Sequence, residues 1–180
     1  DFQGDAALGF WGWPFDSEQA PLNAARAALG IRAAFQEFAG LPDHPLSRFE
    51  MGIGIAHGRA VAGKIGTAEQ VKVTVFGPVV NLASRLETMT SQLRVPILLD
   101  EATTELVRAS MPHDEGRTRR LGKIVPVGLE TAVQVSELLP PEADFPELTD
   151  EHLAQYEEAV EHFTNGDWES AWQCLHKLPA

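Results

Sequence analysis

The spacing of apolar and polar positions along the chain predicts a mixture of strands and helices. Several stretches are rich in β-branched or aromatic residues, or alternate apolar residues with glycine, and these predict strands: residues 2–11 (two short strands), 49–57, 60–62, 71–76, 95–99, 122–127 and 132–138. Other stretches repeat apolar residues at three- and four-residue steps and predict helices: residues 19–38, 81–93, 101–109, 148–163 and 168–175. Strands and helices alternate through most of the chain, which is typical of an α/β or α+β domain.

Turn residues set the boundaries between these elements. Gly4 and Asp5 form a tight turn between the first two strands, which places a carboxylate near the tip of a hairpin. Gly128 marks the turn between the last two strands. Beyond it, three prolines indicate a linker: Pro140, Pro141 and Pro146. The chain is therefore predicted to divide into a domain over residues 1–139, a linker over residues 140–147 and a helical hairpin over residues 148–180.

The last two helices resemble one helical hairpin of the tetratricopeptide type. The resemblance rests on small and aromatic residues at packing positions around an Asn-Gly turn: Tyr156, Ala159, Gly166, Trp168 and Ala171. Such repeats need about three copies to bury a continuous core. The pair is therefore expected either to dock on the preceding domain, which we favour, or to begin a repeat array.

Composition and charge narrow the classes of function. The chain is 44% hydrophobic and 22% charged, as in soluble globular proteins, and no stretch approaches the roughly 20 apolar residues of a membrane-spanning helix. With 26 acidic residues against 14 lysines and arginines, the net charge of -12 argues against a nucleic-acid-binding surface. The single cysteine, Cys174, allows neither an intrachain disulfide nor a cysteine-rich zinc site. A cytoplasmic location is expected, either as a separate protein or as the cytoplasmic part of a larger sensor, with no membrane contact by this segment.

Two patterns that would suggest other chemistry do not fit their surroundings. The run GRAVAGK at residues 58–64 has the spacing of a phosphate-binding P-loop, but Ile65 stands where a Ser or Thr hydroxyl is needed. A strand also begins too soon afterwards for the helix that such a loop requires. The six histidines form neither an HExxH pair nor a Cys/His ligand pattern, and the acidic residues beside His162 are expected to form a solvated helix face. No P-loop and no histidine metal site is assigned.

The segment GPVVNLASR, residues 77–85, joins a predicted strand to a predicted helix. Asn81 and Arg85 are four residues apart, so a helix places both on the same face. An arginine there can donate several hydrogen bonds to a phosphoryl group, and an asparagine can hold a neighbouring oxygen. On spacing alone, a helix-capping asparagine and a surface arginine are the simpler explanation.

Three motifs, taken together and in this order, resemble the class III adenylate and guanylate cyclase catalytic domain of the bacterial type. They are FQGDA near the start, the glycine-rich MGIGIAHGRAVAGKIGT of residues 51–67, and a signature formed by Thr74, Gly77, Val80, Asn81, Ala83, Ser84 and Arg85. The resemblance covers residues 1–139 and implies a ferredoxin-like βαββαβ core. The family's first strand would precede residue 1, so we expect a core that lacks its first strand and helices and carries the C-terminal helical hairpin.

The resemblance implies a nucleotide cyclase, a phosphorus–oxygen lyase that converts ATP to 3',5'-cyclic AMP and pyrophosphate in cyclic-nucleotide signalling. In such an enzyme Arg85 would stabilise charge on the α-phosphate and Asn81 would position the ribose. Two divalent cations, Mg2+ or Mn2+, would be bound by Asp5 and by a second aspartate from the first strand, which this chain lacks. Because the family builds its active sites between two subunits, a homodimer is expected.

The resemblance also indicates where substrate choice and activity depart from the common pattern. Asp1 and Thr74 occupy the base-reading positions: threonine is typical of adenylate cyclases, whereas a carboxylate suits the N–H groups of guanine. ATP is therefore the preferred substrate and GTP the alternative. Val127 stands where the family often has a lysine, and Lys123 or Arg120 would have to bind phosphate instead. A catalytically weak regulatory and dimerisation module is a second hypothesis, and a ferredoxin-like interaction domain is a third.

Overall fold

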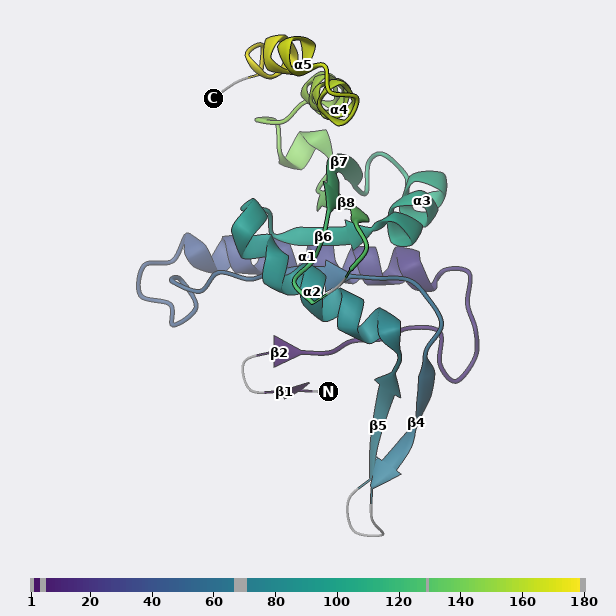
Figure 1. Ribbon diagram of the computed structural model, residues 1–180. Helices are drawn as coiled ribbons and strands as arrows, with labels where there is room; N and C mark the ends of the chain where they lie inside the picture. Colours follow the sequence, from purple (N-terminus) through teal and green to yellow (C-terminus); the bar gives the residue numbers. More distant parts are fainter. Residues whose placement is uncertain (1, 4–5, 67–70, 129, 179–180) are drawn as a thin grey trace.

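The computed structural model describes residues 2–3, 6–66, 71–128 and 130–178 (Figure 1). Its centre is a four-stranded sheet with the order β3-β6-β8-β7, built from β3 (Ile53–Ile55), β6 (Ile97–Asp100), β8 (Val133–Leu139) and β7 (Arg117–Ile124). β3 is parallel to β6, and the other neighbours are antiparallel. Two short hairpins add β1 (Phe2–Gln3) with β2 (Ala6–Ala7), and β4 (Val61–Gly66) with β5 (Val71–Phe76). The predicted mixture of strands and helices is confirmed.

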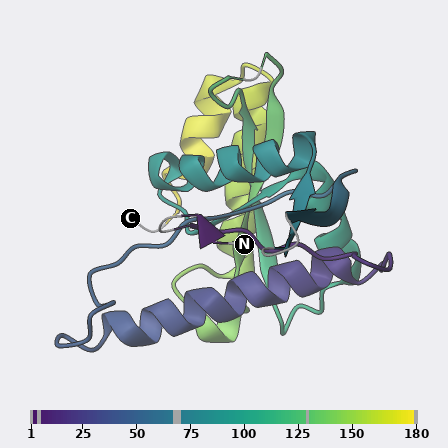
Figure 2. The same ribbon diagram turned by 90° about the horizontal axis from the view of Figure 1, so that it is seen from below.

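Helices cover both faces of the central sheet (Figure 2). One face carries α1 (Ala20–Ala39) and α3 (Glu101–Ser110), and the other carries α2 (Pro78–Leu93). In β6, Ile97 and Leu99 pack with α1 and α3, whereas Leu98 packs with α2, and all three side chains are fully buried. A strand covered on both faces is a continuous apolar run, which explains why the sequence predicted a buried strand here. Within the described ranges, no helix is both long and apolar enough to cross a bilayer.

Gly54 of β3 lets α2 lie very close to the sheet. A Cβ on Gly54 would overlap the backbone of Ala83 and Glu87, and it would lie 2.8 Å from the Cβ of Leu86. Leu86 is itself fully buried against the sheet. The alternating glycines of residues 49–57 therefore serve the packing of α2 as well as the strand itself.

The hairpin of β4 and β5 projects from the body of the domain (Figure 1). It is six residue pairs long, from Val61 opposite Phe76 to Gly66 opposite Val71. The strand is longer than the predicted 60–62, because backbone pairing with β5 carries it through Gly63 and Gly66. The segment that has P-loop spacing is thus largely a strand, and the rejection of a P-loop is confirmed.

β7 begins earlier in the sequence than the predicted strand at residues 122–127. The prediction missed its first half because three of those four residues are arginines, which do not form an apolar pattern. Arg119 forms an ion pair with Glu137 of β8, with 2.6 Å between Nη2 and Oε2, and only 5% of the Glu137 side chain is exposed. Burial raises the pKa of Glu137 above its usual range, although the neighbouring Arg119 and Arg32 act in the opposite direction. Charged residues that are covered by other elements do not produce the apolar pattern of a strand.

The C-terminal helices, α4 (Asp150–Thr164) and α5 (Trp168–Leu175), follow the short 3-10 helix η1 (Glu142–Asp144). α4 packs on β7. Glu157 of α4 accepts a hydrogen bond from the backbone N–H of Arg120 at 2.7 Å and forms an ion pair with Arg108 of α3. The guanidinium of Arg119 lies 4.6 Å from the ring centroid of Tyr156. Of the two expected arrangements, docking on the preceding domain is the one observed.

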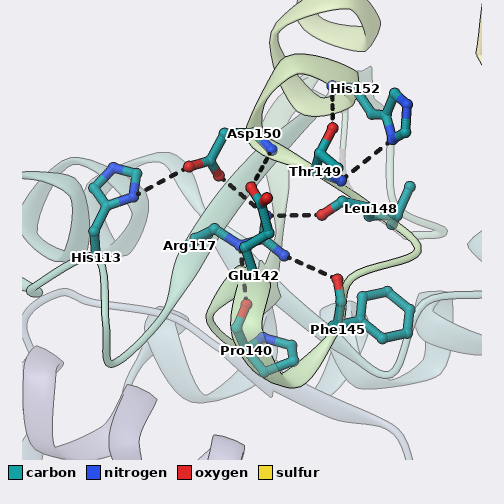
Figure 3. A network of polar contacts seen from close by, with 9 residues as sticks. All are labelled: His113, Arg117, Pro140, Glu142, Phe145, Leu148, Thr149, Asp150 and His152. Carbon is teal, nitrogen blue, oxygen red and sulfur yellow. Dashed lines mark hydrogen bonds and ion pairs between the residues drawn. The ribbon is translucent and has the colours of Figure 1, made fainter.

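Arg117, in β7, ties the linker to the domain (Figure 3). Only 2% of its side chain is exposed. Its guanidinium donates to backbone carbonyl groups in the linker and directly after it: Pro140 at 3.0 Å, Phe145 at 3.5 Å and Leu148 at 2.7 Å. It also donates to the carboxylate of Asp150 at 3.0 Å. Arg117, which the sequence pattern did not single out, therefore makes several of the contacts between the linker and the domain.

Candidate active site

Gly77 makes the sharp turn between the end of β5 and the start of α2. Its φ is +154°, and a Cβ there would lie 3.0 Å from the carbonyl oxygen of Arg59 and 3.2 Å from the Cα of Ala60. Backbone conformation and close approach both require glycine at this position. Pro78 occupies the first turn of α2, where its missing N–H has no helical partner to lose. The Gly-Pro pair thus fixes the angle between the β4–β5 hairpin and α2.

Asn81 and Arg85 lie one turn apart on α2 and are both exposed. The helix-capping explanation for Asn81 is wrong, because α2 begins at Pro78 and its N-cap is Gly77. Among the described residues, neither the side chain of Asn81 nor that of Arg85 forms a hydrogen bond or an ion pair. α2 contacts β3 through Ala83, whereas Asn81 and Arg85 are exposed, so both polar groups are accessible to a ligand.

Gly128, in the turn between β7 and β8, lies directly against the guanidinium of Arg85. A Cβ on Gly128 would be 3.0 Å from Nη2 and 3.4 Å from Cζ of Arg85, and the φ of Gly128 is +83°. Sequence reasoning recognised Gly128 only as a turn residue. Its left-handed backbone was predictable from the glycine, but its contact with Arg85 joins segments more than 40 residues apart.

The other predicted site residues are less closely grouped. Thr74 lies on β5 opposite Gly63, half-buried and three residues before the turn at Gly77. Lys123, on β7, is exposed and lines a cavity of about 210 Å³ against α4, together with Arg120, Gln134, Val160, Glu161, Thr164 and Asn165. Lys123 thus faces α4 there.

The predicted metal and base ligands fall partly outside the described ranges. Asp1 and Asp5 are not among the residues that the structure describes. Within the described part of the chain, only one cluster of three or more potential metal-binding side chains occurs, and it lies on α4 and α5. No cluster of three or more such side chains lies beside Asn81 and Arg85 among the described residues.

Comparison with known proteins agrees with this geometry. The family model of the adenylate and guanylate cyclase catalytic domain matches residues 3–124. Adenylate cyclase 1 of Rhizobium meliloti is 29% identical over 144 residues, which are 77% of this chain but 20% of that protein. The chain therefore corresponds to a small part of this relative's length.

Solved structures give the same result. A bacterial light-regulated adenylyl cyclase superposes with a TM-score of 0.56 at 25% identity, covering 69% of this chain and 34% of that one. The guanylyl cyclase Cya2 superposes with a TM-score of 0.52 at 27% identity, covering 73% of this chain and 64% of that one. On the match to the family model, with the signature residues placed on α2 and its turn, the chain belongs to the adenylate and guanylate cyclase catalytic domain family.

Proposed function

We propose that this chain is the catalytic part of a nucleotide cyclase that converts ATP to 3',5'-cyclic AMP and pyrophosphate. The observation that carries the proposal is the exposed, unengaged pair Asn81 and Arg85 on α2, presented by the turn at Gly77. The proposal assigns residues 1–139 to the catalytic domain, 140–147 to a linker and 148–180 to an appended helical hairpin. It places the reaction in the cytoplasm, as expected for a chain with a single cysteine.

In the proposed reaction the 3'-oxygen of the ribose attacks the α-phosphorus of the same nucleotide. The bond from the α-phosphorus to the bridging oxygen breaks, pyrophosphate leaves, and the 3'-hydroxyl loses its proton. Nucleophile and electrophile belong to one molecule, so the protein mainly has to align them and stabilise charge. Arg85 would donate to the α-phosphate oxygens where negative charge develops, a contribution of about 3–4 kcal/mol for one preorganised donor. Asn81 would hold the ribose in the attacking orientation.

Divalent cations, when bound, would activate the 3'-hydroxyl and neutralise the phosphates. We assign Asp5 to them, together with a second aspartate outside this chain. A carboxylate is the ligand that Mg2+ and Mn2+ prefer. The FQGDA motif that contains Asp5 supports the assignment, as does the match to the family model, which spans residues 3–124 and so includes this position.

The proposed active enzyme is a homodimer with its active sites at the interface. The projecting β4–β5 hairpin supports this, because its apolar side chains lie in solvent: Val61 is 73% exposed, Ile65 52% and Phe76 54%. Adjacent exposed apolar residues on a projecting hairpin are typical of an interaction surface. A second copy of this chain is the partner that would bring its metal-binding Asp5 to the site that carries Asn81 and Arg85.

We propose adenine as the base, read by Thr74 and Asp1. The relative from Rhizobium meliloti and the light-regulated structure, both described as adenylate or adenylyl cyclases, support this choice. GTP is the alternative substrate, supported by the carboxylate of Asp1 and by the likeness to the guanylyl cyclase Cya2. Val127, 78% exposed and without a charge to bind phosphate, supports a catalytically weak regulatory module as the second candidate function.

The test is product analysis with the full-length protein, each of the four nucleoside triphosphates, and Mg2+ or Mn2+. Cyclic AMP as the main product is expected, and Arg85→Ala should lower its rate by about 100- to 1,000-fold. Arg94→Ala changes an exposed arginine at the other end of α2 and should leave the rate unchanged. Cyclic GMP as the main product would favour the alternative substrate, and absence of any cyclic nucleotide would favour the regulatory module. Equal rates for the native and Arg85→Ala proteins would refute the role of Arg85.

A further inference from the structure

The C-terminal helices bring together three side chains with different metal-binding groups. Glu158 and His162 lie one turn apart on α4, and Cys174 reaches them from α5. One carboxylate oxygen, one imidazole nitrogen and the sulfur all lie within 4.8 Å of one another. His162 and Cys174 are half-buried, and Glu158 is exposed. We propose that these three residues bind a zinc ion that fastens α5 to α4.

The set of ligands points to zinc rather than to the hard cations of the cyclase reaction. Thiolate, imidazole and carboxylate are the three side-chain ligands that zinc uses in proteins, whereas Mg2+ takes oxygen ligands. Around a tetrahedral zinc with bonds of about 2.0–2.3 Å, neighbouring ligand atoms lie about 3.5 Å apart. Glu158 is exposed, so rotation of its side chain can bring its carboxylate closer to the other two ligands. Water or an added ligand would occupy the fourth position.

A fourth residue, Asp167, orients the imidazole for this role. Its Oδ2 lies 3.2 Å from Nδ1 of His162, while its Oδ1 accepts a hydrogen bond from the backbone N–H of Ser170 as the N-cap of α5. A carboxylate on Nδ1 holds the proton there and leaves the lone pair of Nε2 for a metal, as is usual around zinc-binding histidines.

The other ring nitrogen of His162 faces Glu158. Its Nε2 lies 3.9 Å from Oε1 of Glu158, close to the spacing of two ligands on one zinc ion. The net charge of -12 of the whole chain further favours a cation over an anion at this site. Zinc there would link α4 and α5 in addition to the packing of their small residues, Ala159 and Ala171, which are 1% and 3% exposed.

The experiment is a metal titration of the full-length protein after treatment with a chelator, with Co2+ as the spectroscopic probe. The expected result is one equivalent of bound Co2+ with a thiolate-to-metal charge-transfer band, displaced by Zn2+. The band separates this site from the cyclase site, for which no thiolate is proposed. Cys174→Ser should abolish the band, and His162→Ala should weaken Zn2+ binding at least tenfold. Asp167→Asn keeps a residue suited to capping α5 and should weaken binding about 10- to 100-fold.

Two control variants test whether the effect is specific. Glu161→Gln removes a neighbouring exposed acid on α4, and His176→Ala removes the other histidine near Cys174; both should bind Zn2+ as tightly as the native chain. Circular dichroism of each variant with chelator present shows whether the helices are retained before metal is added. The absence of a thiolate band, or equal Zn2+ affinity of the native, Cys174→Ser and His162→Ala proteins, would overturn the proposal. Because the readouts are binding and spectra, cyclase activity does not enter the result.

Discussion

Replacing Arg117 by methionine tests whether one side chain holds the linker and the helical hairpin on the domain. The side chain is 2% exposed, and the change leaves the carbonyl groups of Pro140, Leu148 and Phe145 without their donor. Hydrogen bonds from a charged donor contribute about 1.5–3 kcal/mol each and are not additive when they share one donor. Asp150, 52% exposed, is rehydrated when its partner is lost, so its ion pair contributes little.

Removing one partner of a buried charged network costs about 3–5 kcal/mol. We expect a loss of about 3 kcal/mol in the free energy of unfolding. This is the lower end of that range, because the exposed carboxylate of Asp150 can be rehydrated. Urea denaturation measures it, and amide hydrogen exchange should show lost protection over residues 140–150. Arg26→Met is the control: Arg26 pairs with Glu115 at 2.6 Å on the surface, with 42% and 36% of the side chains exposed, and the change should leave the free energy of unfolding nearly unchanged. Equal losses for the two variants would refute the reasoning.

Three further predictions concern the site, the sheet and the dimer. Gly128→Ala introduces a Cβ at a φ of +83° and 3.0 Å from Nη2 of Arg85; it should cost about 1–2 kcal/mol in unfolding and lower the cyclase rate more than Gly166→Ala, which strains a φ of +80° away from the site. Glu137→Gln removes a carboxyl whose pKa is raised by burial. Relative to this variant, the native chain should lose stability as pH rises from the usual value of 4.5 through the raised pKa, and a difference independent of pH in urea denaturation would contradict this. Val61→Asp places a charge on the β4–β5 hairpin, and sedimentation should show more monomer than for the native chain or for Ile31→Asp, a matched change on α1; an unchanged dimer would exclude this hairpin from the interface.

The elements with strong apolar patterns were predictable from the sequence. The buried strand β6 and the helix α2 lie where apolar spacing placed them, apart from shifts of up to three residues at their ends. The start of β7 was predicted five residues too late, because Arg117 and Arg119 make the first half of the strand polar. Their burial depends on the linker carbonyls and on Glu137, which are contributed by distant parts of the chain. The polarity of a side chain therefore predicts whether it is buried only when no distant partner pairs with its charge.

The candidate active site also has one part that the sequence predicted and another that it did not. The four-residue spacing of Asn81 and Arg85 was sufficient to place both on one helical face. The close approach of α2 to Gly54 of β3 explains which face is exposed. The contact of Arg85 with Gly128 was not predictable, because it depends on how the β7–β8 turn lies over α2. Lys123 was predicted to bind phosphate from its position in the sequence, yet it lines a cavity beside α4; its role in phosphate binding stays a prediction.

The sequence by itself determined the family, the type of most elements and the pair Asn81 and Arg85, because these depend on local periodicity and on motifs that are contiguous in the chain. The tertiary structure alone decided that α4 docks on β7, that Arg117 closes around the linker, and that Cys174 meets Glu158 and His162. These contacts join residues between 12 and 37 positions apart, and no local rule of spacing relates such residues. Their juxtaposition is set by the packing of whole helices and strands, in which burial of apolar surface selects one arrangement among many.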